Sequence, residues 1–340
     1  MKIMKFMGMS LLASSLLLGA SSVADKAKNA GLKAIPADKA ELMKLIDTKK
    51  NITPKRVELG KKLFFDPGLS KSELISCNTC HNLGIGGVDG IPAARGHMWR
   101  ANPHHLNSPT VYNAVFFKRQ FWDGRSPDLE DQAKGPTLAA PEMAATPELI
   151  EERINSMPGY VKEFKKAYGD NVKINFDKIT EAIAIFERTL VTPSRFDDFL
   201  NGKKDALTPA EKEGLNVFID KGCAACHNGI ALGGTMQKFP LFKPYKYANV
   251  GDFKGDKNGM VKVPTLRNIT ETPPYFHNGA IWSLKEAVQE MGRTQLGQEI
   301  SSADADKIVT FLGALKGRKP VIEYPQLPAI TAKTPKPAFD

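Results

Sequence analysis

The four cysteines of this chain are the side chains best suited to chemistry, and they fall into two copies of one pattern. Residues 77–81 read CNTCH and residues 223–227 read CAACH, so both follow the spacing C-x-x-C-H. This is the spacing of c-type haem attachment, in which both thiols bond covalently to the porphyrin and the adjacent histidine ligates the iron from the proximal side. The sequence therefore predicts two haem c groups. The residues that would attach and ligate them are Cys77, Cys80, His81, Cys223, Cys226 and His227.

Other roles of paired cysteines explain this pattern less well. A short disulfide or a redox dithiol is the ordinary function of a single C-x-x-C in an exported protein. A zinc site built from two cysteine pairs would not require a histidine in both copies. Thioredoxin-like chemistry would need a βαβ context that the sequence lacks. Two haem sites remain the preferred interpretation.

The second axial position of each iron decides whether that haem transfers electrons or binds a substrate. The first half of the chain offers mainly histidines for this position and the second half mainly methionines. A methionine ligand raises the reduction potential of haem iron, because the soft thioether favours the ferrous state. The second haem is therefore a candidate high-potential electron store, but spacing alone does not select one ligand. The candidates are His97, His104, His105, Met98 and Met143 after the first motif, and Met236, Met260, Met291 and His277 after the second.

An internal duplication relates the two halves. Residues 109–113 (PTVYN) match residues 264–268 (PTLRN), and residues 121–124 (FWDG) match residues 276–279 (FHNG) at the same displacement of 155 positions. The two cysteine motifs are only 146 positions apart, so the second half carries about nine extra residues after its motif, in a stretch that includes the glycine-rich segment 229–234. Two related haem domains follow from this duplication.

Helix signals dominate the rest of the chain. Thr-Pro pairs at residues 53–54, 146–147 and 208–209 predict helix starts, and further helices are expected over residues 176–190, 208–221, 283–292 and 303–316. Alternating strand patterns are scarce. We therefore expect a mainly α fold of two tandem cytochrome c-like haem domains with long loops. The expected division is an N-terminal domain over residues 25–200, a C-terminal domain over 201–318 and an extended Pro-rich tail over 319–340, with the junction in residues 191–207.

The N-terminus predicts export. Lys2 and Lys5 precede an apolar run, and Ser22-Val23-Ala24 is a small-x-small cleavage pattern, so residues 1–24 are expected to be a signal peptide. No later segment is apolar enough to span a bilayer. Without the signal the chain keeps 45 basic and 37 acidic residues, a net charge of +8. This charge is spread along the chain, which argues against nucleic-acid binding and favours an acidic patch on a partner protein.

Several ordered motifs give the chain a family resemblance. Over nearly all of its mature length it resembles the bacterial dihaem cytochrome c peroxidases. The motifs that carry the resemblance are residues 59–66 (LGKKLFFD), 121–125 (FWDGR), 141–143 (PEM), 264–268 (PTLRN), 274–279 (PYFHNG) and 290–292 (EMG).

The resemblance implies a distal ligand for each haem. His97, sixteen residues after His81, would be the removable distal ligand of the N-terminal, peroxidatic haem. Met291 would be the distal ligand of the C-terminal, electron-transferring haem. The resemblance also places Trp122 between the two haems.

Further site residues follow from the same resemblance. Glu142 and Gln132 would lie in the peroxide pocket, where a carboxylate can move a proton between the two peroxide oxygens and an amide can orient the substrate. Calcium would bind between the domains at Asn107, Thr272 and Pro274, with waters completing its shell.

The implied activity is the reduction of hydrogen peroxide to water in the periplasm. The high-potential haem would pass electrons from a small c-type cytochrome or copper protein to the low-potential peroxidatic haem, and the family suggests a homodimer. The alternative is a dihaem electron-transfer cytochrome without peroxidase activity. A related enzyme that oxidises protein-bound tryptophan resembles this family with Tyr in place of the distal Met, so Met291 argues against that function. A haem sensor would normally carry a fused signalling segment.

Overall fold

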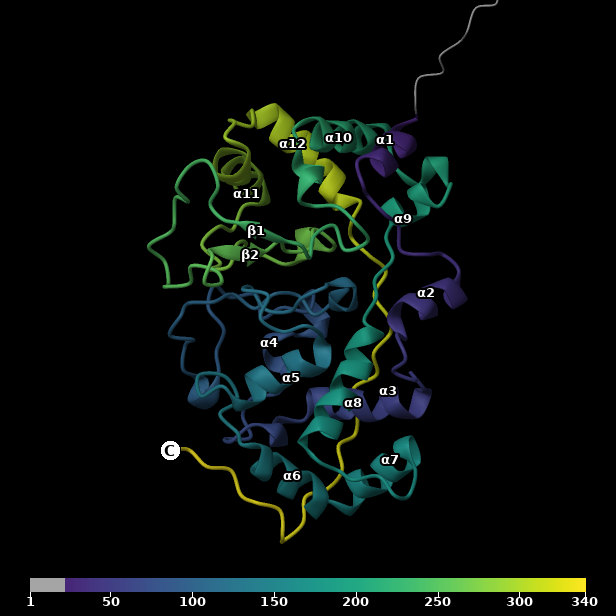
Figure 1. Cartoon of the computed structure of the whole chain (residues 1–340), viewed down its shortest axis with the longest axis vertical. Helices are drawn as coiled ribbons and strands as arrows, with labels where there is room; N and C mark the ends of the chain where they lie inside the picture. Colours follow the sequence, from purple (N-terminus) through teal and green to yellow (C-terminus); the bar gives the residue numbers. More distant parts are fainter. Residues whose placement is uncertain (1–21) are drawn as a thin grey trace, which may run out of the picture.

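The computed structural model describes residues 22–340, and helices are its main regular elements. Figure 1 shows two lobes stacked along the long axis, the lower one built around α3 to α8 and the upper one around α10 to α12. The mainly α fold predicted from the sequence is confirmed. The helices are α1 (Val23–Asn29), α2 (Lys39–Ile46), α3 (Pro54–Phe65), α4 (Cys77–Cys80), α5 (Leu129–Leu138), α6 (Pro147–Ser156), α7 (Pro158–Tyr168), α8 (Phe176–Arg188), α9 (Arg195–Leu200), α10 (Pro209–Asp220), α11 (Leu284–Met291) and α12 (Ser302–Gly313).

The helix starts follow the capping signals. Side-chain oxygens of Thr53, Thr146, Thr208 and Ser283 each accept a hydrogen bond from a main-chain N–H in the first turn of the helix that follows. This satisfies donors that have no partner inside the helix. The sequence did not predict the small antiparallel hairpin of β1 (Met236–Lys238) and β2 (Met260–Lys262).

Each lobe has its own hydrophobic core, and the two cores share one packing device. In the first, α3 crosses α8 so closely that a side chain at Gly60 would collide with the main-chain oxygen of Ala182. In the second, α10 crosses α12, and Gly214 meets the main-chain oxygen of Lys307 in the same way. A glycine at the crossing lets the two backbones touch, so the duplication extends to helix packing.

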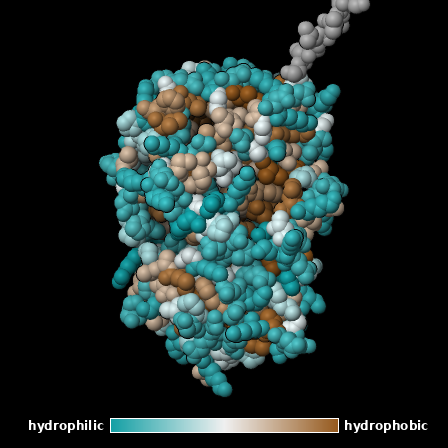
Figure 2. Space-filling view, viewed as in Figure 1, coloured by the Kyte–Doolittle hydropathy of each residue, from teal (hydrophilic) through white to brown (hydrophobic). Residues whose placement is uncertain are grey.

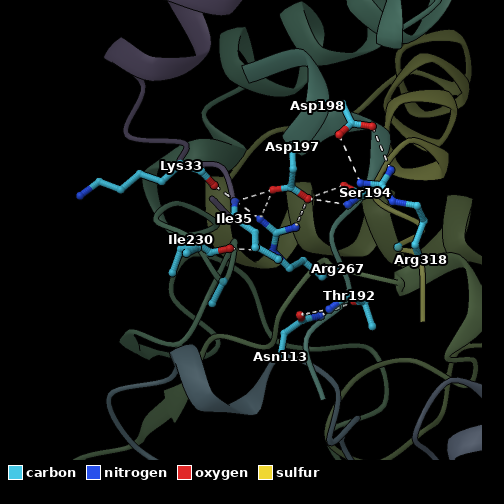
Figure 3. Close-up of polar contacts among 12 residues, drawn as sticks. Lys33, Ile35, Asn113, Thr192, Ser194, Asp197, Asp198, Ile230, Arg267 and Arg318 are labelled. Atoms are coloured by element: carbon cyan, nitrogen blue, oxygen red, sulfur yellow. Dashed lines mark hydrogen bonds and ion pairs between the residues drawn. The ribbon is translucent and has the colours of Figure 1, made fainter. Parts of the chain in front are cut away.

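The two copies of the duplicated Pro-Thr segment meet at Thr192, which connects the lobes. The side-chain amides of Asn113 and Asn268 both donate to Thr192 Oγ1, at 2.7 and 2.9 Å. Both asparagines adopt a left-handed backbone conformation, with φ of 63° and 59°. Figure 3 shows Asn113 and Thr192 in this arrangement. The lobes are therefore joined through the same residue type at equivalent positions.

Segments at each end of the described chain pack on the lobe that is distant in sequence. Leu32, near the start of the described chain, lies in the second core. Phe196, in the middle of the chain, lies in the same core, although the sequence assigned residues 25–200 to the first domain. The tail beyond residue 318 runs back along the first lobe (Figure 1), where the Tyr324 ring lies 5.1 Å from that of Phe65. Buried Arg153 holds this tail by donating to the main-chain oxygens of Pro335 and Lys336.

Figure 2 shows a largely hydrophilic face with separate apolar patches. Within residues 22–340, none of the helices has the length and apolarity needed to cross a membrane. The predicted signal peptide, residues 1–24, lies outside the described residues except for its last three positions. Its predicted cleavage after Ala24 falls in the first turn of α1.

Candidate functional site

The first cysteine motif forms one helical turn with an oriented histidine at its end. Cys77 and Cys80 begin and end α4, and both thiols are free and half-buried. His81 follows, and its Nδ1 lies 3.0 Å from the carbonyl oxygen of Pro109. Burial lowers the pKa of His81, so the ring is neutral, with Nδ1–H donating and Nε2 left as the free lone pair. This is the tautomer that a metal-ligating histidine needs.

The second motif repeats the arrangement. Cys223 and Cys226 are free and half-buried, and His227 Nδ1 lies 3.3 Å from the carbonyl oxygen of Leu232. Burial lowers the pKa of His227 to about 4. Thr265 fixes this loop by donating from Oγ1 to the Ala231 oxygen at 2.6 Å. The matching Thr110 donates to Gly86 at 2.7 Å in the first lobe.

A largely apolar cavity adjoins the second motif. Its empty volume, counted together with space that is open to solvent, is about 1340 Å³, and Cys223, Cys226 and His227 lie on its wall. Apolar groups supply most of the remaining surface, among them leucine, isoleucine and aromatic side chains. A site with both thiols, a neutral imidazole and an apolar wall fits a covalently attached haem.

Only one of the three candidate methionines lines that cavity. Met291, the last residue of α11, faces it from the wall that also includes Leu284 and Val288. Met236 instead packs its sulfur against Gly124 of the first lobe. Met260 is not on the cavity wall.

His97 lies beside Glu142 on the first lobe. Its main-chain N–H donates to the main-chain oxygen of Glu142 at 2.6 Å, and a side chain at Gly96 would collide with the main-chain oxygen of Pro141. The ring is 8 % exposed. Its Nε2 is 3.4 Å from the main-chain oxygen of Asp340, while buried Nδ1 has no partner among residues 22–340. A buried nitrogen without a hydrogen-bond partner is consistent with a histidine that contacts a bound group.

The other histidines lie elsewhere. His104 Nδ1 pairs with Asp252 at 3.0 Å on the surface. His105 is next to it in the same loop. His277 is buried among aromatic rings, including Phe253 at 5.3 Å between ring centroids, and burial lowers its pKa to about 4.

Glu142 is close enough to the first attachment site to act on it electrostatically. Burial raises the pKa of Glu142, with Arg125 partly opposing the rise. Burial also raises the pKa of the Cys80 thiol to about 12, and the negative charges of Asp89 and Glu142 add to this. Gln132 lies on α5, partly buried, and its side-chain amide has no hydrogen bond to the described part of the chain.

The structure brings the three predicted calcium ligands and Trp122 to one region. Asn107, Thr272 and Pro274 come from different lobes, yet all line the cavity together with Trp122. The Trp122 indole N–H donates to the Asn107 main-chain oxygen at 2.9 Å. The Asn107 side-chain amide donates to the Ile91 oxygen at 2.8 Å.

Two important residues of this region were not among the site residues predicted from the sequence. Arg267 is fully buried and forms two 2.8 Å bonds to Asp197, as Figure 3 shows. It also donates to the Ile230 oxygen and so holds the loop that follows His227. The second residue is Lys262, which lines the cavity just before the Pro-Thr motif.

The chain is similar to proteins of known families. Residues 54–205 match the family model of the di-haem cytochrome c peroxidases, and residues 211–316 match that of cytochrome c. The chain is 48 % identical over 299 residues to the cytochrome c551 peroxidase of Pseudomonas aeruginosa, covering 84 % of this chain and 86 % of that protein. It is also 48 % identical over 298 residues to the cytochrome c551 peroxidase of Nitrosomonas europaea, covering 84 % and 88 %.

A solved structure shares the fold. The structure of a MauG-like protein associated with microbial copper homeostasis superposes with a TM-score of 0.69 at 24 % identity, covering 79 % of this chain and 91 % of that one. The two haem c groups predicted from the cysteine motifs are thereby supported by both family matches. This chain belongs to the di-haem cytochrome c peroxidase family.

Proposed function

We propose that the protein reduces hydrogen peroxide to water in the periplasm, with electrons from a small c-type cytochrome or copper protein. The observation that carries this proposal is the difference between the two distal sides. The second site has Met291 on an apolar wall, which suits an electron store. The first has His97 bonded to the segment that contains Glu142, which suits a site that opens and moves protons.

The bound haems would supply the redox chemistry, and the chain's own residues would prepare the substrate. Glu142 would accept the proton of the peroxide oxygen nearer the iron and deliver it to the departing oxygen. Burial favours the proton-carrying form of this carboxyl, so it can hold a proton between the two steps. Gln132 would orient peroxide by hydrogen bonding with its free amide.

The segment after His97 supports its role as a removable ligand. Met98 and Trp99 have φ of 59° and 56°, a backbone conformation that residues other than glycine rarely adopt. Trp99 is also 55 % exposed. Backbone strain of this kind is typical of segments with a second accessible arrangement. Trp122 would lie between the haems, since it lines the cavity and comes from the first lobe.

Calcium would bind where Asn107, Thr272 and Pro274 meet. Amide and carbonyl oxygens from both lobes are among the ligands that this cation takes, and bridging the lobes would stabilise their contact. A homodimer and export by a cleaved signal peptide belong to the same proposal. They rest on family resemblance and on the sequence of residues 1–24.

The test is peroxide-dependent oxidation of a reduced monohaem cytochrome, measured before and after half-reduction in calcium buffer. We expect fast turnover by the half-reduced protein. Glu142→Gln should reduce the rate about 10²- to 10⁴-fold, because it removes a positioned acid and base. Glu148→Gln, at an exposed position of α6, is the matched control and should keep the rate. No turnover in either redox state would instead favour the electron-carrier alternative.

A further inference from the structure

Lys262 carries a buried positive charge that the proposed function does not use. It is the last residue of β2 and is 4 % exposed. Its ammonium lies 4.4 Å from the centroid of the Phe117 ring. It forms no ion pair and no side-chain hydrogen bond with any residue between 22 and 340.

Nothing in the described chain neutralises this charge. Burial lowers the pKa of Lys262 to about 7, and the attraction of Asp123 offsets only part of that effect. The Asp123 carboxylate is itself 2.9 Å from a guanidinium nitrogen of Arg125. Burying an ammonium without an anionic partner is strongly unfavourable. The position therefore favours a bound anion.

The cavity identifies the chemistry of that anion. Among the described residues that line it, Lys262 is the only one with an acidic carboxyl, ammonium or guanidinium group. The same wall carries His227 and Met291, which fit an attached haem. A haem c is a mostly apolar macrocycle with two propionate carboxylates, so its shape and charge match an apolar cavity with one cationic side chain.

We propose that Lys262 forms an ion pair with a propionate of the second haem and raises the reduction potential of that haem. The ion pair would orient the macrocycle, because the ammonium would hold a propionate while the thioether bonds would hold another part of the ring edge and the histidine would ligate the iron. The positive charge would raise the potential because it stabilises the added electron of the ferrous state in a low-dielectric setting. This inference requires that a haem occupies the cavity, and it does not depend on whether the protein reduces peroxide.

Lys262→Met tests the charge, because methionine keeps much of the length and removes the ammonium. In the two-haem protein we expect the equilibrium constant for reducing the second haem to fall about tenfold, which is a shift of about 59 mV to lower potential for one electron. The first haem should keep its potential. Lys238→Met, an exposed lysine on the paired strand of the same hairpin, is the control and should leave both potentials unchanged.

Resonance Raman spectra give an independent readout through the propionate bending mode of the second haem. This band should shift in Lys262→Met and not in Lys238→Met. Lys262→Arg should retain the charge and stay near the wild-type potential. Should Lys262→Met fail to incorporate the second haem, incorporation restored by Lys262→Arg would support the ion pair, and failure of both variants would reject a charge-based role.

A wild-type potential and an unshifted propionate band in Lys262→Met would overturn the proposal. Peroxide turnover is scored separately with the wild-type protein. If the wild type showed no turnover but Lys262→Met showed the expected potential shift, the proposed function would be rejected and the ion pair would still be supported.

Discussion

The main-chain N–H of Lys262 donates a 2.7 Å hydrogen bond to the carbonyl oxygen of Trp122. A strand beside the second haem cavity is thus bonded directly to the residue that we propose to lie between the haems. The Trp122 indole extends the connection to Asn107, a proposed calcium ligand. The strand that carries Lys262 is therefore connected through Trp122, by two hydrogen bonds, to a proposed calcium ligand.

Trp122→Phe should weaken calcium binding about fivefold. Phenylalanine keeps an aromatic ring in the site but loses the 2.9 Å bond to the Asn107 main-chain oxygen, which holds Asn107 in place. One such bond contributes about 1 kcal/mol. Calorimetric titration with calcium measures the effect. Trp282→Phe, at a position 57 % exposed, is the control. Equal calcium affinities in the two variants would show that the Trp122 indole does not contribute to calcium binding.

His97→Gly should open the first haem in the fully oxidised protein. Without an imidazole at this position the iron loses its distal ligand, so optical and electron spin resonance spectra should show a high-spin first haem. His104→Gly is the control, because His104 pairs with Asp252 on the surface. A low-spin first haem in the His97 variant would show that another side chain is the distal ligand.

Met291→Leu should lower the potential of the second haem by more than about 59 mV, a tenfold change in the reduction equilibrium. Among the three candidate methionines, Met291 alone lines the cavity, so Met236→Leu and Met260→Leu should leave the potential unchanged. Redox titration followed by visible absorption measures all three. A shift confined to one of the other variants would reassign the ligand.

Glu187→Gln should change how stability depends on pH. Burial raises the pKa of Glu187 from 4.5 to about 8, and nearby Glu130 adds to the rise. Between these values the folded protein holds a proton that the unfolded chain has lost. The wild type should therefore lose stability as pH rises, by on the order of 1 kcal/mol per pH unit.

The glutamine variant lacks this titration, so its advantage over the wild type should grow from pH 5 to pH 8 in urea unfolding. Glu181→Gln, a partly exposed position of the same helix, provides the comparison. A constant difference between the Glu187 variant and the wild type at all pH values would contradict the buried, protonated carboxyl.

Asp197→Asn should destabilise the second lobe by about 3–5 kcal/mol, because it leaves the Arg267 guanidinium buried without its counter-charge. Burial alone would raise the pKa of Asp197, but Arg267 and main-chain donors hold it below its usual value. Asp198→Asn is the adjacent control. Its ion pair with exposed Arg318 (Figure 3) should contribute less than about 1 kcal/mol. Similar losses in both variants, measured by chemical unfolding, would contradict the importance of the buried pair.

Local sequence was sufficient for features that depend on a few neighbouring residues. The C-x-x-C-H motifs predicted both haems, since attachment chemistry is contained within five positions. Thr-Pro signals predicted helix starts, since a cap bonds only to the turn that follows it. The repeated Pro-Thr segments predicted two related halves, and these meet symmetrically at Thr192.

Tertiary structure decided which distant segments share a surface. Sequence spacing left three methionines open, whereas packing puts Met291 in the cavity and Met236 against Gly124. It also assigns α9 to the second core and carries the tail back over the first lobe. The burial of Lys262 is likewise visible only in the tertiary structure. A lysine side chain is ordinarily solvated, and the sequence does not show that folding removes this one from water.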